Sequence, residues 1–304
     1  GVVFTTAQEL GVGIGAKARA LLDSHSVSFS GGTISLHSES GVPLRSLGIG
    51  STRLLVAGLQ RKAANRASIV LSDELEYGLE PHRINRFLSS LGAKEDAPLQ
   101  AFLTTHSPVA LRELSGKQLF VLRRGPNGHE IRTVGVDNDT QSTIRLFPEA
   151  FLASSVIICE GASEIGLLRG LDLNRLEQGA VSMAAQSVAL IDSGGGEADR
   201  PYARAAVFQS LGYRVMVFRD DDVKPTHAIE QAFLQKGGTV VKYREGRALE
   251  DELFGSLSPE ACQQLIVYAD ELHGDVIHEH LRTASNNSIT VQSVWDEVQS
   301  SKAL

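Results

Sequence analysis

The segment at residues 155–164 reads Ser-Val-Ile-Ile-Cys-Glu-Gly-Ala-Ser-Glu. A short apolar run, a glycine and then a helix-capping serine predict a buried strand that turns into a helix. Glu160 ends this strand and Glu164 follows four residues later. Open α/β sheets bind their ligands beyond the carboxyl ends of the strands. We therefore expect the two carboxylates to face one site above the end of the strand.

A second apolar run ends in acids at residues 215–222, which read Val-Met-Val-Phe-Arg-Asp-Asp-Asp. Side chains two residues apart in an extended chain point the same way, so Asp220 and Asp222 converge while Asp221 faces elsewhere. Carboxylate oxygens are the ligands that Mg²⁺ and Mn²⁺ prefer. With the two glutamates, these aspartates predict a site for one or two such ions. Solvated or helix-capping acids are the alternative.

The second half of the chain alternates strands and helices, which is typical of an α/β fold with a parallel sheet. The expected strands are 155–159, 187–191, 214–218 and 239–243, the expected helices are 163–170, 199–211 and 227–236, and a helical segment follows residue 250. For the first half the expected helices are 16–22 and 81–91, the expected strands are 33–37, 69–71 and 99–104, and a hairpin joins 118–122 to 130–134.

The first half also contains an apolar strand that ends in adjacent acids, Asp73 and Glu74, before a turn and a helix. In an ATPase, the first carboxylate holds a Mg²⁺-bound water, and the second orients or deprotonates the water that attacks the γ-phosphate. A strand that ends in two acids also occurs in many other α/β proteins. The pattern therefore indicates an ATPase only together with other motifs.

This region resembles the Walker B and D-loop region of ABC-type ATPases. The resemblance implies that His106 is the switch histidine and that Ser46 and Gly48 belong to the signature loop. In that family, the amides of the signature loop contact the γ-phosphate of a nucleotide held by the opposite subunit. Taken singly, the histidine is also compatible with a structural role, and the glycine with a plain turn.

The phosphate-binding loop of such ATPases, G-x-x-x-x-G-K-[ST], is absent from the sequence. The nearest segment, residues 11–17, has Ala16 in place of the second glycine, and Ala18 follows its lysine. We interpret residues 1–147 as the back half of a split ATPase domain, and we expect ATP to bind only in a full-length protein. The start at Gly1, without a methionine, favours a fragment of a longer protein.

The acids of the second half resemble the TOPRIM fold. Type IA and type II topoisomerases, bacterial primases and nucleases of the OLD (overcoming lysogenisation defect) family share this fold. The Glu-Gly at 160–161 and the Asp-x-Asp at 220–222 match its two hallmarks. Glu164 and the glycine run after Asp192 resemble the OLD branch. That run also predicts a turn, which makes Asp192 a weaker ligand candidate.

Half of an ABC-type ATPase followed by a TOPRIM domain, here residues 148–304, is the arrangement of OLD proteins. The resemblance implies hydrolysis of DNA phosphodiester bonds with two divalent ions, and an acid near residue 250 that completes the second metal site. We assign this role to Glu250, with Glu252 as the alternative because a helix that begins here also attracts acids. The family's lysine near the scissile phosphate corresponds to Lys302, unless that lysine is a plain surface residue. Further candidates for phosphate contact are Arg244 and Arg247.

In this interpretation Asp220, Asp222 and Glu164 hold one ion, and Glu160 and Glu250 hold the other. The ions are Mg²⁺ or Mn²⁺, with Ca²⁺ as a further option. One stabilises the leaving oxygen or the pentacovalent phosphate, and the other lowers the pKa of the attacking water. Which ion does which stays open. A lysine or arginine would offset the charge that develops on the phosphate.

The formal net charge of −7 argues against a surface covered with lysine and arginine that grips phosphates without specificity. Residues 1–145 carry 16 basic and 13 acidic residues, whereas residues 146–304 carry 13 and 23. The acidity therefore belongs to the second half. It predicts either a solvated surface or carboxylates that hold divalent cations.

Two cysteines in apolar runs, Cys159 and Cys262, cannot form a disulfide framework, so we expect a reducing, cytoplasmic location. No signal peptide is recognisable, and no apolar run has the length of a membrane span. The resemblance implies DNA as the substrate and a homodimer for the full-length protein. It also implies a separate helicase as a partner in phage defence.

Two other functions stay open. TOPRIM topoisomerases and primases need a transesterifying tyrosine or a zinc module. Two cysteines exclude a Cys₄ zinc site, but the sequence excludes none of the five tyrosines. The other function is that of a non-catalytic, ATP-gated DNA-binding module whose metal site has decayed. The complete set of acids argues against such a loss of the metal site.

Overall fold

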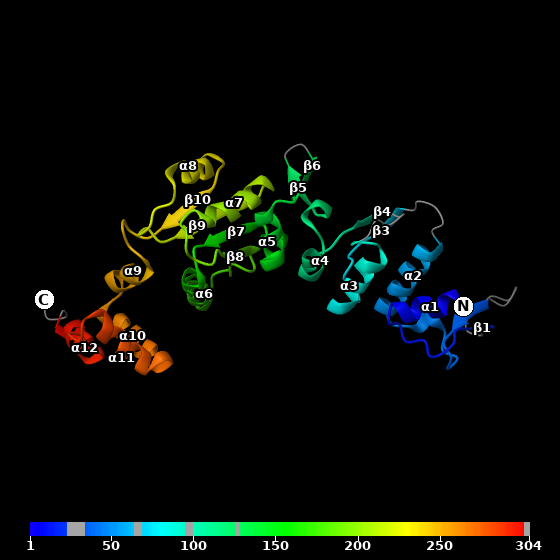
Figure 1. Ribbon diagram of the computed structural model, residues 1–304, viewed down its shortest axis with the longest axis horizontal. Helices are drawn as coiled ribbons and strands as arrows, with labels where there is room; N and C mark the ends of the chain where they lie inside the picture. The colour runs from blue at the N-terminus through cyan, green and yellow to red at the C-terminus, as the bar shows by residue number, and fades with distance from the viewer. Residues whose placement is uncertain (23–33, 64–68, 95–99, 126–127, 301–304) are drawn as a thin grey trace. The chain divides into compact units, whose positions relative to one another are not determined.

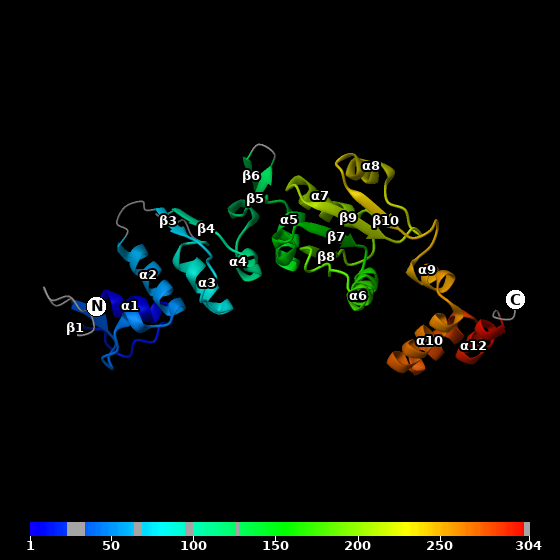
Figure 2. The same ribbon diagram turned by 180° about the vertical axis from the view of Figure 1, so that it is seen from behind.

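Figure 1 shows the chain as a computed structural model, which describes residues 1–22, 34–63, 69–94, 100–125 and 128–300. Figure 2 shows the same ribbon from behind. The fold divides into two units. The first comprises Gly1–Val156, Ser187–Ala189 and Val207–Tyr213, and the second comprises Ile157–Gln186, Leu190–Ala206 and Arg214–Leu304.

Within the described residues, the first unit has three two-stranded sheets. They are the antiparallel pair β1 (Arg19–Leu22) and β2 (Ile34–His37), the parallel pair β3 (Ile69–Ser72) and β4 (Gln100–Leu103), and the antiparallel pair β5 (Phe120–Gly125) and β6 (Gly128–Thr133). The helices are α1 (Val2–Glu9), α2 (Ile49–Ala63), α3 (Pro81–Ser90), α4 (Pro108–Glu113) and α5 (Asn138–Leu146), with short 3₁₀ helices η1 (Leu44–Ser46), η2 (Gly116–Gln118) and η3 (Pro148–Leu152).

The core of the first unit lies among α1, α2 and α3. Leu54 on α2 and Leu88 on α3 are almost completely buried in it, as is Leu75 in the turn after β3. Burial of such a leucine contributes about 1.5–3 kcal/mol. Because Leu75 is anchored in this core, the polar residues on either side of it are held at the edge of the β3–β4 sheet.

The expected helix over 16–22 is wrong. The structure has β1 there, and Arg19 of β1 lies opposite His37 of β2. Pairing with a distant strand overrides the weak helix preference of so short a segment. The expected hairpin is confirmed as β5–β6, and the expected helix after Pro81 is confirmed as α3, with the proline in its first turn.

A four-stranded sheet, in the strand order β10-β9-β7-β8, contains the acids singled out in the sequence. Its strands are β7 (Ser155–Cys159), β8 (Val188–Asp192), β9 (Arg214–Arg219) and β10 (Thr239–Lys242). β9 and β10 are parallel. The Glu160 amide donates to the Phe218 carbonyl, and the Ser193 amide donates to the Cys159 carbonyl, both at 3.0 Å. The carboxyl ends of β9, β7 and β8 therefore meet at one edge, and the expected α/β pattern is confirmed.

Three helices connect these strands: α6 (Ala162–Glu177), α7 (Arg200–Ser210) and α8 (His227–Gln235). From β7 the chain moves to one side of the sheet to form β8, and it then returns past β7 to form β9 and β10. Right-handed crossovers in opposite directions place their helices on opposite faces. In Figures 1 and 2, α6 accordingly lies on one face of the sheet, and α7 and α8 lie on the other.

The chain continues after β10 as helices, as the sequence predicts. They are α9 (Leu249–Ser256), α10 (Pro259–His273), α11 (Asp275–Ala284) and α12 (Val291–Ser300). Among the residues that the structure describes, no helix is both long enough and apolar enough to cross a membrane.

Candidate functional site

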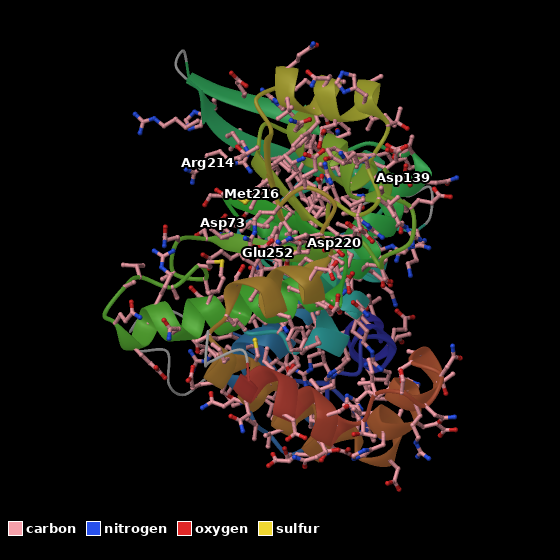
Figure 3. All side chains as sticks on the ribbon, turned by 90° about the vertical axis from the view of Figure 1, so that its left-hand side faces the viewer. Asp73, Asp139, Arg214, Met216, Asp220 and Glu252 are labelled. Atoms are coloured by element: carbon pink, nitrogen blue, oxygen red, sulfur yellow. The ribbon has the colours of Figure 1, made fainter. Side chains whose placement is uncertain are left out.

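The carboxyl ends of β7 and β9 bring several acids together. Glu160 Oε2 accepts a hydrogen bond from the main-chain N–H of Asp220 at 3.1 Å. Glu164, in the first turn of α6, is 4% exposed, and its Oε2 accepts from the Gly161 amide at 2.8 Å. Asp220, labelled in Figure 3, has a buried Oδ1 that receives no hydrogen bond from any residue the structure describes. We call Glu160, Glu164, Asp220 and Asp222 the acid cluster.

The surroundings of the cluster raise the pKa of two of its acids, Asp220 and Glu160. Burial, the charges of Glu164, Glu160 and Asp222, and a carboxyl–carboxyl hydrogen bond with Glu164 raise the pKa of Asp220 to about 7. Burial also raises the pKa of Glu160; the Asp220 amide opposes this shift, and the charges of Glu164 and Asp222 add to it. Like charges raise a carboxyl pKa only at short range, so Glu160, Glu164 and Asp222 lie near Asp220.

The cluster is not a ready-made metal cage. No group of three or more His, Cys, Asp or Glu side chains in the described ranges is arranged to hold a metal ion. Glu160 and Glu164 each accept a hydrogen bond from a main-chain amide through one carboxylate oxygen. Asp222 Oδ1 likewise accepts a hydrogen bond from the Val223 amide at 2.6 Å. The donor set nevertheless fits a hard cation, because all its atoms are carboxylate oxygens and Asp220 Oδ1 is buried without a donor.

Asp221 faces away from the cluster, as strand alternation predicts, and it is completely buried. Its carboxylate accepts hydrogen bonds from Arg219 Nη1 at 3.1 Å, Lys242 Nζ at 2.9 Å and the Gly246 amide at 3.2 Å. Burial opposes its ionisation, but these three donors lower its pKa below the usual value. Arg219 also donates to Glu230 at 3.0 Å. This network, which the sequence did not reveal, fixes the loop that contains the neighbouring ligand candidates.

Glu252, the alternative fifth ligand, is occupied by arginine. Arg244 Nε donates to its two carboxylate oxygens at 2.8 and 3.0 Å, and this hydrogen bonding is the main cause of a pKa of about 2 for Glu252. Arg247 Nη1 lies 3.7 Å from the same carboxylate. The structure thus turns both arginines toward Glu252, which Figure 3 labels. Glu250 is exposed, and its charge acts on Tyr243, as do the charges of Glu164 and Asp220.

The structure favours a turn as the role of Asp192. Its Oδ1 accepts from the Gly194 amide at 2.6 Å. Gly194, Gly195 and Gly196 have φ values of 85°, 63° and 93°, which only glycine adopts without strain. Lys302 lies outside the described residues, so its assignment to a phosphate contact stays a prediction.

In the first unit, Asp73 and Glu74 follow β3 and are exposed. Thr104, directly after β4, links them: its Oγ1 donates to Asp73 Oδ1 at 2.5 Å and accepts from the Glu74 amide at 2.9 Å. Glu74 has a φ of 45°, in the left-handed region that non-glycine residues rarely adopt. Such strain occurs at functional sites, where the surrounding hydrogen bonds hold it in place.

Glu76 joins this turn to the segment after β4. Its carboxylate accepts from Thr105 Oγ1 at 2.6 Å and from the His106 amide at 2.7 Å. Burial opposes its ionisation, but the hydrogen bonds from Thr105 and the His106 amide lower its pKa below the usual value. The structure therefore connects His106 to the acid turn through Glu76, a residue that the sequence did not single out as functional.

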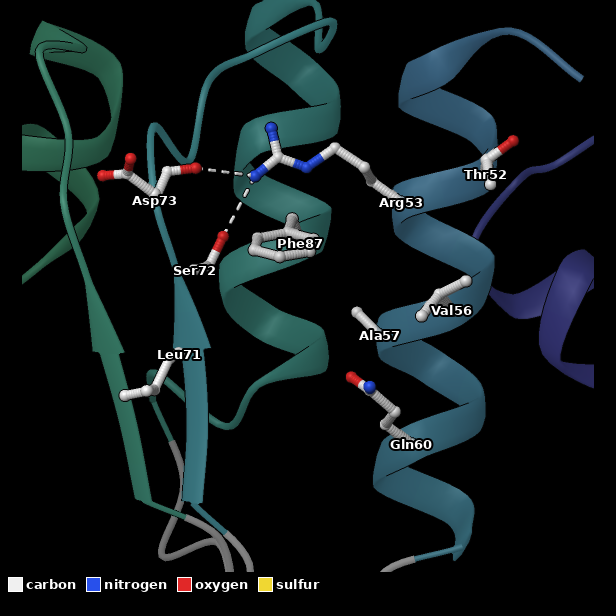
Figure 4. Close-up of a pocket in the computed structure, with 9 residues that line it drawn as sticks. All are labelled: Thr52, Arg53, Val56, Ala57, Gln60, Leu71, Ser72, Asp73 and Phe87. Carbon is white, nitrogen blue, oxygen red and sulfur yellow. Dashed lines mark hydrogen bonds between the residues drawn. The ribbon is translucent and has the colours of Figure 1, made fainter.

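Arg53 of α2 holds the same turn from its other side (Figure 4). Its Nη1 donates to the carbonyls of Glu74 and Tyr77 at 2.9 Å, and its Nη2 donates to Ser72 Oγ and the Asp73 carbonyl at 3.0 Å. A pocket of about 360 Å³ lies beside it, between α2, α3 and the end of β3. Its lining is made of Thr52, Arg53, Val56, Ala57, Gln60, Leu71, Ser72, Asp73 and Phe87.

The segment before α2 contains Ser46 and Gly48, both exposed. Ser46 Oγ donates to the Pro43 carbonyl at 2.6 Å. Two residues after Gly48, a Cβ on Gly50 would lie 2.1 Å from the Gly78 carbonyl oxygen, so only glycine fits there. The beginning of α2 thus packs directly on the turn that follows Asp73 and Glu74. Gly50, a residue of the segment that resembles the signature loop, makes this approach possible.

Residues 8–112 match a family model described as "AAA domain, putative AbiEii toxin, Type IV TA system". The match includes the acid turn after β3, the switch-histidine candidate and the segment before α2. It confirms the expected ATPase-type domain in the first part of the chain. No curated protein matches the chain.

Proposed function

We propose that this chain is a divalent-metal-dependent DNA nuclease. Its acid cluster would hydrolyse phosphodiester bonds, and in a full-length protein an ATP-bound form of the ATPase-type domain would control it. The main support is the convergence of Glu160, Glu164 and Asp220 around a buried carboxylate oxygen that has no hydrogen-bond donor. Burying such an oxygen costs free energy unless a proton or cation satisfies it.

Asp220, Asp222 and Glu164 would hold one ion, and Glu160 and Glu250 would hold the other. When bound, the ions supply an activated water and neutralise charge on the phosphate. Glu164 already shares a hydrogen bond with Asp220, and its Oε2 accepts from the Gly161 amide. To bind an ion with both of its oxygens, Glu164 would have to release this amide.

The surrounding residues keep the cluster in place and limit its charge. Asp221 is neutralised by Arg219 and Lys242, so it adds little repulsion to the acids on either side of it. Asp220, with a pKa of about 7, holds a proton for part of the time at neutral pH in the absence of metal. It would release this proton to water as a cation binds, because ligand carboxylates bind in the ionised form.

The topoisomerase alternative requires a tyrosine that becomes a nucleophile. Among the tyrosines that the structure describes, Tyr243 is the one whose pKa responds to charges of the acid cluster. Burial is the main cause that raises this pKa, and the carboxylate charges raise it further. A phenol that keeps its proton is a weak nucleophile. This observation favours hydrolysis by water over transesterification by the protein.

Asp73 and Glu74 follow β3, and His106 lies just beyond its partner β4, which supports the proposed Walker B and switch-histidine roles in ATP hydrolysis. The β3–β4 sheet leaves Leu71 77% exposed and Phe102 55% exposed. Parallel sheets normally have both faces covered. Uncovered apolar side chains here support the proposal that further elements, among them a phosphate-binding loop, complete this domain in a full-length protein.

DNA as the substrate, a homodimeric full-length form, a helicase partner in phage defence and a cytoplasmic location rest on the resemblance to OLD nucleases. They are part of this proposal. The description of the matching family includes the words "putative AbiEii toxin, Type IV TA system". This description is compatible with an enzyme of phage defence.

The test is cleavage of supercoiled and linear DNA in the presence of Mg²⁺, Mn²⁺, Ca²⁺ or EDTA. The parent chain should cleave with Mg²⁺ or Mn²⁺, and Asp220→Asn should be inactive. Glu177→Gln, on an exposed position of α6 outside the cluster, is the matched control and should keep full activity. Equal cleavage by the parent chain and Asp220→Asn would show that the acid cluster is not the active site.

A further inference from the structure

The hydroxyl of the half-buried Tyr243 is a buried polar group that the proposed reaction does not use. It follows β10 directly, and its ring packs edge-on against Phe218 of β9, with the centroids 5.2 Å apart and the planes at 67°. Its hydroxyl oxygen is buried and makes no hydrogen bond within the part of the chain that the structure describes. A buried hydroxyl normally finds a partner, so one without a partner calls for an explanation.

The position of Tyr243 places it beside Asp220. β9 and β10 are parallel neighbours, and Lys242 lies opposite Arg219 in their register. Tyr243 and Asp220 are the next residue on each chain. Parallel neighbouring strands lie about 4.8 Å apart, which brings these two residues to the same edge of the sheet. The charges of Glu164, Asp220 and Glu250 all act on the Tyr243 hydroxyl.

The two side chains complement each other as hydrogen-bond donor and acceptor. Asp220 Oδ1 is a buried acceptor that receives no hydrogen bond, and the Tyr243 hydroxyl is a buried donor that gives none, within the described residues. In the structure the carboxylates near them are turned to main-chain amides or to each other. A carboxylate that binds a metal through one oxygen usually accepts a hydrogen bond on the other, and that bond fixes its orientation.

We propose that Tyr243 is a positioning residue of the metal site, whose hydroxyl donates a hydrogen bond to Asp220 when that carboxylate binds a cation. The inference rests on the proposed metal-dependent function. It assigns to Tyr243 a role that does not involve contact with DNA. The hydroxyl is buried, so it acts through Asp220 and keeps this ligand aimed at the ion.

The experiment compares the parent chain with Tyr243→Phe by titration calorimetry with Mn²⁺ alone and by thermal unfolding in EDTA. We expect Tyr243→Phe to bind Mn²⁺ about 10–100-fold more weakly, the range found for residues that orient metal ligands. In EDTA it should be at least as stable as the parent chain, because the hydroxyl it loses has no partner there. Tyr268→Phe, at an exposed position on α10, is the control and should change neither measurement.

The outcomes separate this inference from the proposed function. If the parent chain neither binds Mn²⁺ nor cleaves DNA, the proposed function fails. If the parent chain binds Mn²⁺ and Tyr243→Phe binds it equally well, only the role of Tyr243 is overturned. Weaker binding together with a lower unfolding temperature in EDTA would also overturn it, because the tyrosine would then be a structural residue. A covalent adduct between Tyr243 and DNA would do so as well.

Discussion

Asp221 Oδ1 accepts a hydrogen bond from Lys242 Nζ at 2.9 Å, which ties the loop after β9 to the end of β10. Arg219 holds the same carboxylate from within the core. The loop between the two strands contains Asp220 and Asp222, so this ion pair fixes the main chain on which two of the metal-ligand candidates depend.

Asp221→Asn should destabilise the protein by about 3–5 kcal/mol, because it leaves the buried Arg219 guanidinium without its full counter-charge. The measurement is urea unfolding in EDTA. Asp222→Asn is the neighbouring control; Asp222 is exposed and lies among like charges, so its neutralisation should leave the midpoint unchanged or slightly raised. Equal midpoints for the two variants would contradict this account of Asp221.

Glu160→Gln should keep the fold and lose at least ~100-fold in metal-dependent DNA cleavage, since it removes a ligand charge. The amide oxygen of glutamine can still accept the hydrogen bond from the Asp220 amide, so the unfolding temperature should stay near that of the parent chain. Glu245→Gln, at a surface position close in sequence to Glu250, serves as the control. Full cleavage by Glu160→Gln would remove Glu160 from the set of ligands.

Gly50→Ala should destabilise the first unit by about 1–3 kcal/mol, because the new Cβ would lie 2.1 Å from the Gly78 carbonyl oxygen. Gly48→Ala is the matched control: a Cβ at Gly48 meets no atom within 4 Å. Denaturant unfolding of the two variants, followed by circular dichroism, measures the difference. If the two alanines have the same effect, the beginning of α2 does not pack on the turn as described.

Glu76 should make the stability of the first unit depend on pH. Its pKa in the folded protein lies below the value of 4.5 for an exposed glutamate, so its contribution is fully present above pH 4.5. That contribution is lost as the pH falls through the folded pKa. Glu76→Gln should therefore be less stable than the parent chain by about 1 kcal/mol at pH 7, and the gap should close toward pH 3. A gap that is constant from pH 7 to pH 3 would show that the ionised carboxylate adds nothing.

The sequence predicted those parts of the fold and the candidate site that depend on local pattern. The apolar runs before Glu160 and Asp220 are strands, and the alternation of side chains in the second run separates Asp221 from its neighbours. The acid turn at Asp73 and Glu74 also lies at the end of a strand, inside the region that matches an ATPase-type family model. In each case a few consecutive residues determine the result.

The residues that the sequence did not reveal depend on pairing between distant segments. Tyr243 lies beside the acid cluster only because β10 adds to β9, and Glu76 lies beside His106 only because β3 pairs with β4. The wrong helix over 16–22 has the same cause, since β1 exists through its pairing with β2. The orientation of the carboxylates in the cluster could not be predicted either, because main-chain amides compete for their oxygens.

The most direct test of the central claim is removal and return of the metal in one assay on supercoiled DNA. The parent chain is first treated with EDTA, then dialysed and supplied with Mn²⁺. If the acid cluster is a metal-dependent nuclease site, the parent chain should not cleave DNA after EDTA treatment. Mn²⁺ should restore cleavage in the parent chain but not in Asp220→Asn. Cleavage that persists in EDTA, or that returns equally in Asp220→Asn, would contradict this claim.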